Sequence, residues 1–114
     1  MFKNFNLNDN DMAQKVIAGV TVNANDEGYF EDPSQWNKDM AVEMSKEYNI
    51  ELTDKHFAVL EFLRQKYLAG EQLTIRKVGT SGITDIKEFY KLFPGGPLKI
   101  SSKLAGIPKP TSCV

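Results

Sequence analysis

Residues 100–114, ISSKLAGIPKPTSCV, are the stretch around which the rest of the sequence is organised. They hold the only cysteine, Cys113, next to the last residue. Pro108 and Pro110 stiffen an extended arm in front of this thiol, and Gly106 offers a hinge at the end of a short helical pattern. Cysteines that serve packing are usually buried in a core. A thiol on an extended arm is therefore predicted to serve chemistry.

The arm has the reach to enter the pocket of another protein. Residues 107–114, extended like polyproline at ~3.1 Å per residue, span roughly 25 Å. A thiol attacks only as thiolate, so its activity depends on the charges around it. We expect the neighbouring terminal carboxylate to oppose ionisation of Cys113 and nearby cations to favour it. The candidates for binding and activating the arm are Arg76, Lys99, Lys103 and Lys109.

Length and composition indicate one domain. The chain has 114 residues, of which 41% are hydrophobic and 25% charged, as in ordinary soluble proteins. We expect a loose N-terminus over residues 1–14, a globular body over 15–106 and the arm over 107–114. No apolar run approaches the ~20 residues that cross a bilayer, and the start has no apolar signal core. We therefore expect that the chain is not exported and has no membrane partner.

Few residues are available for metal or acid–base chemistry. One cysteine and one histidine exclude an internal disulfide and a zinc site built on several thiolates. Residues 79–82, GTSG, lack the lysine and spacing of a phosphate-binding loop. His56 falls in the first turn of a predicted helix, which disfavours a protonated imidazole, so we interpret it as a structural or surface residue and not as a catalytic base. We expect neither a metal nor a cofactor, and a chain whose chemistry is completed by partner proteins.

The charge is divided unevenly along the sequence. Residues 1–60 carry 5 Lys and Arg against 11 Asp and Glu, a net charge of −6, whereas residues 61–114 carry 9 against 4, a net charge of +5. The thiol end is therefore the basic end. Two interpretations remain open: two solvated faces of opposite sign, or a basic surface that docks an acidic partner or tRNA in a partner's complex. The total of −1 makes direct nucleic-acid binding unexpected.

The N-terminal half predicts a small β-unit followed by a helix. Residues 16–23 alternate with period two, which indicates one strand with Val16, Ala18, Val20 and Val22 on one face. Residues 25–28, NDEG, predict a turn, and Tyr29-Phe30 a short return strand. Asp32 and Pro33 are suited to start a helix. It should run to Asn49, with an apolar stripe at Trp36, Met40, Met44 and Tyr48.

The C-terminal half predicts further helices. Thr53 should cap one that ends at Gly70, and residues 74–78 form a short piece. Thr84 or Asp85 should cap another, whose inward residues are Ile86, Phe89, Tyr90 and Phe93. Pro97 opens the last helix, which Gly106 caps. The fold class is therefore α+β, a small N-terminal β-hairpin or meander packed on an orthogonal array of about five helices with a flexible C-terminal arm.

Several segments resemble the DsrC/TusE family, which includes the gamma component of dissimilatory sulfite reductase and a sulfur-relay protein of tRNA thiolation. The segments are KLAGIPKPTSCV (103–114), YKLFPGGP (90–97), DEGY (26–29), LTDKH (52–56) and FLRQKY (62–67). The resemblance implies helices packed on a small β-meander, a cytoplasmic location and a persulfide carried on Cys113. It also implies that Arg76 lies near the docked arm.

Two positions depart from the family pattern. Relatives that partner sulfite reductase have a second cysteine eleven positions before the first, where this chain has Ser102, so we identify a single-cysteine member. The turn over residues 79–85 is also shorter than in relay-type relatives. We expect a monomeric sulfur carrier, a relay component and not a stand-alone enzyme. It would take sulfur from a persulfide-bearing donor protein and hand it to an acceptor enzyme, with tRNA 2-thiouridine synthesis as one setting.

Two alternatives remain open. A helix, a glycine-containing turn and a helix over residues 74–93 resemble a helix-turn-helix, with Lys87 and Lys91 on one face. The chain could then be a regulator that senses sulfur or redox state through Cys113. The other alternative is a DsrC-like paralogue in sulfite reduction or sulfur oxidation. Finally, because the arm carries few apolar side chains, we expect truncation after Gly106 to leave thermal stability nearly unchanged.

Overall fold

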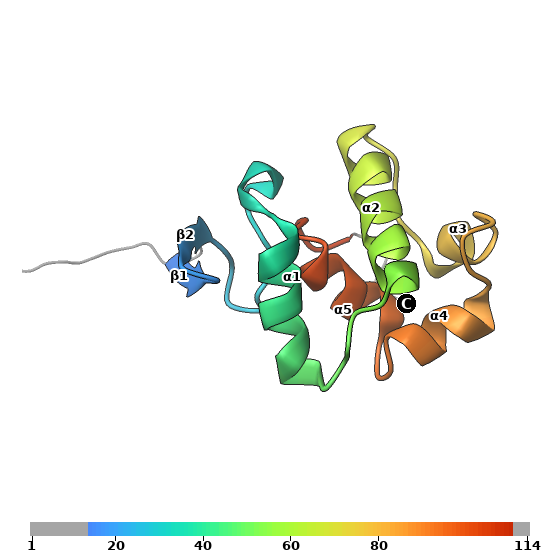
Figure 1. Ribbon diagram of the computed structural model, residues 1–114. Coiled ribbons are helices and arrows are strands. Elements are labelled where there is room, and N and C mark those ends of the chain that lie inside the picture. Colours follow the sequence, from blue (N-terminus) through green and yellow to red (C-terminus); the bar gives the residue numbers. More distant parts are fainter. Residues whose placement is uncertain (1–13, 111–114) are drawn as a thin grey trace, which may run out of the picture.

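The computed structural model describes residues 14–110, which form a two-stranded antiparallel sheet and five α-helices (Figure 1). With 3-10 helices labelled η, the elements are β1 (Gln14–Ile17), β2 (Val20–Asn23), η2 (Pro33–Gln35), α1 (Lys38–Ser45), η3 (Lys46–Tyr48), α2 (Asp54–Leu68), α3 (Ile75–Gly79), α4 (Ile86–Leu92) and α5 (Pro97–Leu104). The hairpin lies at one end, α3 and α4 lie at the other, and α5 lies between α1 and α2. The predicted α+β class is confirmed.

The sheet is a hairpin whose turn lies earlier than predicted. The expected single strand is broken at Ala18 and Gly19, which have φ angles of 52° and 80°. A two-residue turn of this kind joins paired strands without interrupting the alternation of the sequence, so the pattern reads as one strand. The faces change as a result: Ile17 and Val22 are buried, whereas Val16 is 67% exposed. The predicted return strand is reduced to a single bridge between Ala24 and Phe30.

The helix predicted from Asp32 to Asn49 is divided into three parts. Asp32 does cap the first part, η2, by accepting a hydrogen bond from the Ser34 N–H. Asn37 then adopts an extended conformation and accepts the Met40 N–H at 3.0 Å, which starts α1 as a separate helix. Asn49 ends η3 in a left-handed conformation, with φ of 56°. The sequence contained this second cap, but the unbroken apolar stripe concealed the break.

His56 has the structural role expected of it. Its Nδ1 accepts a hydrogen bond from the Thr53 N–H at 3.1 Å, completing a capping box at the start of α2. Its Nε2 then carries the proton and donates to the carbonyl of Leu92 at 2.9 Å. The imidazole also packs edge-on against Phe93. His56 therefore joins the start of α2 to the end of α4.

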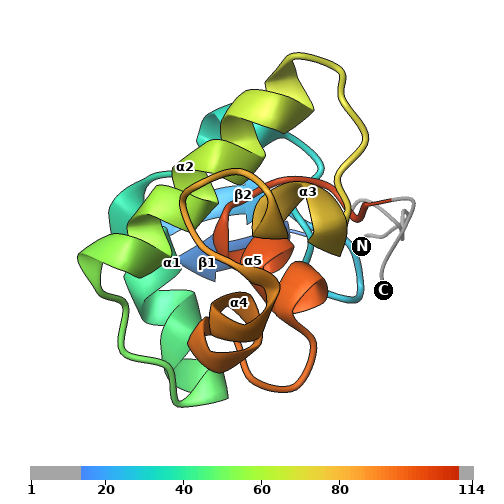
Figure 2. The same ribbon diagram turned by 90° about the vertical axis from the view of Figure 1, so that its right-hand side faces the viewer.

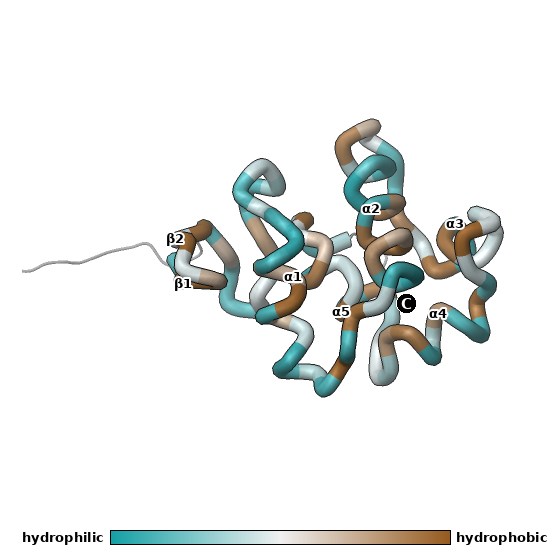
Figure 3. Tube along the Cα trace, in the orientation of Figure 1, coloured by the Kyte–Doolittle hydropathy of each residue, from teal (hydrophilic) through white to brown (hydrophobic). Residues whose placement is uncertain are grey.

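Two groups of buried side chains form the core. The main group lies among the helices, and hydrophobic and hydrophilic positions alternate along α2 and α4 (Figure 3). A smaller group joins the hairpin to α1 through Ile17, Val22, Phe30 and Met40. Trp36 and Met44 pack against both groups. The hairpin is thereby fixed to the helical body through the segment that Trp36 occupies.

The buried face of α4 is narrower than predicted. Phe89 and Phe93 are fully buried, as expected, but Ile86 is 43% exposed and Tyr90 is 49% exposed. Four inward positions would need a helix covered on more than one side, and α4 has only seven residues, packed against α3 and α5. The prediction that Ile86 and Tyr90 point inward is therefore wrong, and α4 carries two apolar side chains on its surface.

Candidate functional site

The arm begins where α5 ends in a hydrogen-bonded reversal. The Gly106 N–H donates to the carbonyl of Lys103 at 3.1 Å, and the Ile107 N–H donates to the carbonyl of Ser102 at 3.3 Å. Gly106 itself has φ of 68°. This pair of bonds around a left-handed glycine is the Schellman motif, which satisfies carbonyls that the helix leaves free. The predicted role of Gly106 as a helix cap is confirmed, and its role as a hinge stays a prediction.

Gly106 is also required by close packing. A Cβ atom at this position would lie 2.3 Å from the Trp36 ring. Positive φ and lack of space therefore act together, so any side chain at residue 106 would displace the indole or the backbone. Because Gly106 is buried against Trp36, the direction in which the chain leaves α5 is fixed by packing.

Two side chains hold the root of the arm, which we define as residues 104–107. The Trp36 Nε1–H donates to the carbonyl of Leu104 at 2.7 Å. Arg64 donates from Nη1 to the carbonyl of Ala105 at 3.0 Å and from Nη2 to the carbonyl of Pro33 at 3.1 Å. The guanidinium lies over the Trp36 ring, 4.4 Å from its centroid. We call Trp36 and Arg64 the clamp, because together they tie the end of α5 to α2 and η2.

The clamp places a cation in partly buried surroundings. Burial lowers the pKa of Arg64, and the carboxylate of Glu61 opposes that shift. Arginine tolerates this environment because its guanidinium stays charged and two carbonyls accept its protons. The sequence pattern predicted no role for Arg64. The available signal was its place on α2, directly after the buried Leu63 and one turn beyond the buried Leu60.

The described part of the arm lies against the body. Ile107 is fully buried and belongs to the main core. Pro108 is half-buried, Lys109 is exposed and Pro110 is buried. The burial of Ile107 argues against the expectation that truncation after Gly106 leaves thermal stability nearly unchanged, and the effect of the truncation stays a prediction. The predicted catalytic residue, Cys113, lies outside the described residues.

The four predicted cations occupy two places. Lys103 and Lys109 lie toward the β2–η2 connection: the Lys109 ammonium is 3.2 Å from the Glu27 carboxylate, and the Lys103 ammonium is 5.2 Å from the centroid of the Tyr29 ring. Arg76 on α3 and Lys99 on α5 are both exposed, and within residues 14–110 neither forms an ion pair. The described contacts do not bring the two pairs together.

Ser102 occupies an unusual environment on α5. Its side chain is fully buried, and among residues 14–110 its hydroxyl has no hydrogen-bond partner. The neighbouring Ser101, also fully buried, donates to the carbonyl of Leu98 at 3.3 Å. A buried hydroxyl without a partner costs stability and carries no structural benefit that we can identify. The position expected to hold a second cysteine in relatives is thus an internal one in this chain.

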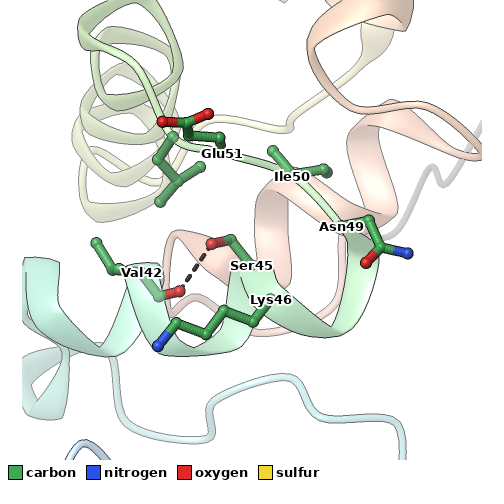
Figure 4. Close-up of a pocket in the computed structure, with 7 residues that line it drawn as sticks. Val42, Ser45, Lys46, Asn49, Ile50 and Glu51 are labelled. Atoms are coloured by element: carbon green, nitrogen blue, oxygen red, sulfur yellow. Dashed lines mark hydrogen bonds between the residues drawn. The ribbon is translucent and has the colours of Figure 1, made fainter.

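The hollows of the surface do not coincide with the clamp. One of about 470 Å³ lies between the end of α1 and the start of α2 and is lined by Val42, Ser45, Lys46, Asn49, Ile50, Glu51 and Leu52 (Figure 4). A cleft of about 170 Å³ between the hairpin and α1 includes Lys103 and Glu27 among its lining residues. Lys103 is thus the predicted site residue that lines this cleft. It lies there with Glu27, whose carboxylate pairs with Lys109.

Residues 14–110 lack two kinds of structural feature. None of the helices there is both long enough and apolar enough to span a bilayer. Nor does this part of the chain gather three or more His, Cys, Asp or Glu side chains in a way that could hold a metal ion. What the geometry does provide is a firmly held root, from which residues 107–110 continue along the body.

Three comparisons place the chain among known proteins. The family model described as DsrC like protein matches residues 16–114. The sulfurtransferase TusE of Salmonella paratyphi A (strain ATCC 9150 / SARB42) is 32% identical over 107 residues, covering 87% of this chain and 98% of that protein. The solution structure of Allochromatium vinosum DsrC is 33% identical with a TM-score of 0.72, covering 89% of this chain and 97% of that one.

A further likeness is to the oxidized gamma-subunit of the dissimilatory sulfite reductase (DsrC) from Archaeoglobus fulgidus, a crystal structure. It is 27% identical to this chain with a TM-score of 0.73, covering 90% of this chain and 100% of that one. The two proteins therefore share their fold over most of this chain.

Proposed function

The chain belongs to the DsrC-like protein family, and on that premise we propose that it is a sulfur-relay protein that carries a persulfide on Cys113. The family membership confirms the resemblance of residues 90–97 and 103–114. The observation that carries the proposal is the clamped root: Trp36 and Arg64 fix the start of an arm whose sequence places a lone thiol near its tip.

The proposed transfer is a thiol exchange that balances without an added oxidant. The Cys113 thiolate attacks the outer sulfur of a donor persulfide, a bond forms between the Cys113 sulfur and that sulfur, and the donor leaves as a thiolate. In the second step a thiolate of the acceptor enzyme attacks the same outer sulfur, and Cys113 returns to its starting state. The sulfane sulfur moves twice, and neither step changes the total number of electrons.

The clamp makes this transfer efficient by limiting what the arm loses on docking. An arm that swung freely from Gly106 would lose orientational freedom each time it entered a partner. With Ile107 in the core and Lys109 paired with Glu27, the first residues of the arm are already held before docking. The two prolines further restrict the arm before it binds. We propose that the body acts as a mount that presents Cys113.

We also propose that Arg76, among the four cations of the sequence prediction, stabilises the thiolate in the docked state. Arg76 is the best suited, because an exposed guanidinium without an ion pair in residues 14–110 is free to receive a carboxylate in two hydrogen bonds. The change Arg76→Ala should then slow alkylation of Cys113 at neutral pH. Lys77→Ala is a matched control, because Lys77 lies on the same helix and pairs with Glu71. Identical alkylation profiles for wild type and Arg76→Ala would remove this role.

The relay is tested by moving labelled sulfur. A cysteine desulfurase loaded with a ³⁵S persulfide is mixed with the full chain, and the label is followed on non-reducing gels. We expect the label to pass to the wild type and to be released by a reductant. Cys113→Ser should stay unlabelled, and Ser102→Ala should be labelled like the wild type. Failure of the wild type to take label from persulfide donors would overturn the proposal.

A second candidate is a component of sulfite reduction or sulfur oxidation, which the likeness to the Archaeoglobus fulgidus gamma-subunit favours. With Ser102 in place of a second cysteine, this chain has no second thiol with which to bridge a sulfur internally. The relay is therefore preferred, with a persulfide-bearing donor protein, an acceptor enzyme such as a tRNA 2-thiouridylase, a monomeric state and a cytoplasmic location as its proposed setting.

A further inference from the structure

The exposed side of α4 has the composition of an interface. Ile86 and Tyr90, one helical turn apart, are 43% and 49% exposed. Lys87 and Lys91, also one turn apart, are exposed beside them. Residues three and four apart are neighbours on a helix surface. The four side chains therefore form one continuous patch of two apolar groups and two cations.

This patch continues onto α3 and α5. Tyr90 lines a hollow of about 220 Å³ together with Ile75 from α3 and the residues at the start of α5, and Lys99 stands among its lining residues. Figure 2, which looks at the molecule from this side, shows α3 and α4 in front with α5 next to them. We define the α4 face as Ile86, Lys87, Tyr90, Lys91 and Lys99.

The charge on this face is not neutralised by the protein itself. Residues 75–99 contain five cations and two carboxylates, and both carboxylates are already engaged. Glu88 lies 3.7 Å from the Lys55 ammonium and accepts the Thr84 hydroxyl at 2.6 Å, while Asp85 caps α4. Among the described residues, none of the three cations of the α4 face takes part in an ion pair. The face therefore offers unpaired positive charge around an apolar centre.

We propose that the α4 face docks an acidic segment of a partner protein, with one apolar side chain of that segment entering the hollow beside Tyr90. The proposal deepens the relay function, since a relay protein must dock its donor and acceptor before sulfur passes. The proposal depends on the relay function only for the identity of the partner protein. The binding chemistry of the face is independent of Cys113.

The observations favour a protein over a nucleic acid. An exposed tyrosine beside an apolar hollow, surrounded by charged groups, has the apolar core and polar rim of a protein interface. A nucleic acid would extend along its phosphates beyond this patch, and residues 1–60 of the chain carry a net charge of −6. A short acidic segment is complementary in charge to the α4 face and does not extend to the acidic part of the chain that would repel it.

The direct test uses a short synthetic peptide of Glu and Asp around one central Phe. It is titrated into the ¹⁵N-labelled full chain and followed by amide chemical shifts. We expect the shifts to gather on α3, α4 and the start of α5. The same peptide with Ser in place of Phe should bind several-fold more weakly. Raising the salt concentration should weaken both peptides, because exposed charges are screened within about 10 Å at 0.1 M.

Paired variants locate the binding. Exposed ion pairs contribute about 0.2–1 kcal/mol each, so Lys87→Ser with Lys91→Ser should weaken the Phe peptide about 2- to 30-fold. Lys38→Ser with Lys46→Ser removes two exposed lysines from α1 and η3 and should leave binding unchanged. Tyr90→Ala should bring the Phe and Ser peptides to equal affinity. Thermal unfolding of each variant verifies that the fold is retained.

Three outcomes would overturn the proposal: shifts outside the α4 face, equal affinity of the wild type for the two peptides, or tighter binding of a single-stranded RNA oligonucleotide than of the Phe peptide. The Cys113→Ser variant separates the two claims. It should lose sulfur labelling and bind the Phe peptide like the wild type. If the wild type takes no label but still binds the peptide, the relay function is wrong and the docking role of the α4 face is retained.

Discussion

Replacing Ile107 by alanine tests whether the root of the arm belongs to the fold. Ile107 is fully buried, and its neighbours Leu104 and Ala105 are fully buried as well. The change removes three carbon atoms, each worth about 0.8 kcal/mol of burial. The cavity left behind adds to this loss, because tightly packed surroundings collapse only in part. Measured changes of this kind cost about 2–5 kcal/mol, and we expect about 3 kcal/mol here.

The assay is thermal and urea unfolding of the full chain, followed by circular dichroism. For a domain of this size, 1 kcal/mol shifts the transition by roughly 3–6 °C, so Ile107→Ala should melt about 10 °C or more below the wild type. Ile107→Val removes one carbon and should cost about 0.5–1.5 kcal/mol. Lys109→Ala breaks only an exposed ion pair and should cost at most about 1 kcal/mol.

This ordering separates packing from tethering. If Ile107 lies in the core, stability falls from wild type through Ile107→Val to Ile107→Ala, while Lys109→Ala stays near the wild type. A value for Ile107→Ala within about 0.5 kcal/mol of the wild type would show that the buried position of Ile107 contributes nothing. The chain from Gly106 onward would then contribute nothing to the stability of the fold, and the contacts of the clamp would not stabilise it.

Three other substitutions examine the clamp and its surroundings by the same unfolding assay. Arg64→Ala leaves the carbonyl of Ala105 without its donor and should cost about 2 kcal/mol, whereas an unchanged transition would mean that water replaces the guanidinium. Gly106→Ala should cost at least about 1–2 kcal/mol from positive φ, with more from the approach of Trp36, and a neutral result would contradict the packing described. Ser102→Ala should be neutral or stabilising because its hydroxyl has no partner among residues 14–110, while Ser101→Ala should cost about 1 kcal/mol, and the reverse order would refute this assignment.

Local signals in the sequence predicted the helices well where one residue sets the backbone. Thr53 and Asp85 cap α2 and α4 by accepting N–H groups three residues ahead, as their side chains predict. Asn49 and Gly106 end their helices with positive φ. These residues act on their own neighbours, so their effect can be read without knowing the rest of the structure.

The failures concern features that depend on distant residues or on geometry that the pattern does not record. The two-residue turn at Ala18 preserves the alternation of the strands and so was invisible to it. Tyr90 has the spacing of a core residue, but its side chain is 49% exposed. The Trp36 contact with Leu104 joins residues 68 positions apart, and the Arg64 contact with Ala105 joins residues 41 apart. No local pattern indicates such pairs, so the clamp became apparent only in the structure.

The central claim is that Cys113 carries sulfur, and mass spectrometry of the intact chain tests it most directly. The full chain is purified under non-reducing conditions after reaction with a persulfide-loaded desulfurase, and the arm peptide is then fragmented. If Cys113 carries sulfur, we expect one added sulfur atom on Cys113. A reductant should remove it, and Cys113→Ser should lack it. A chain whose Cys113 stays a free thiol after reaction with persulfide-loaded desulfurases that label a known carrier would contradict the account.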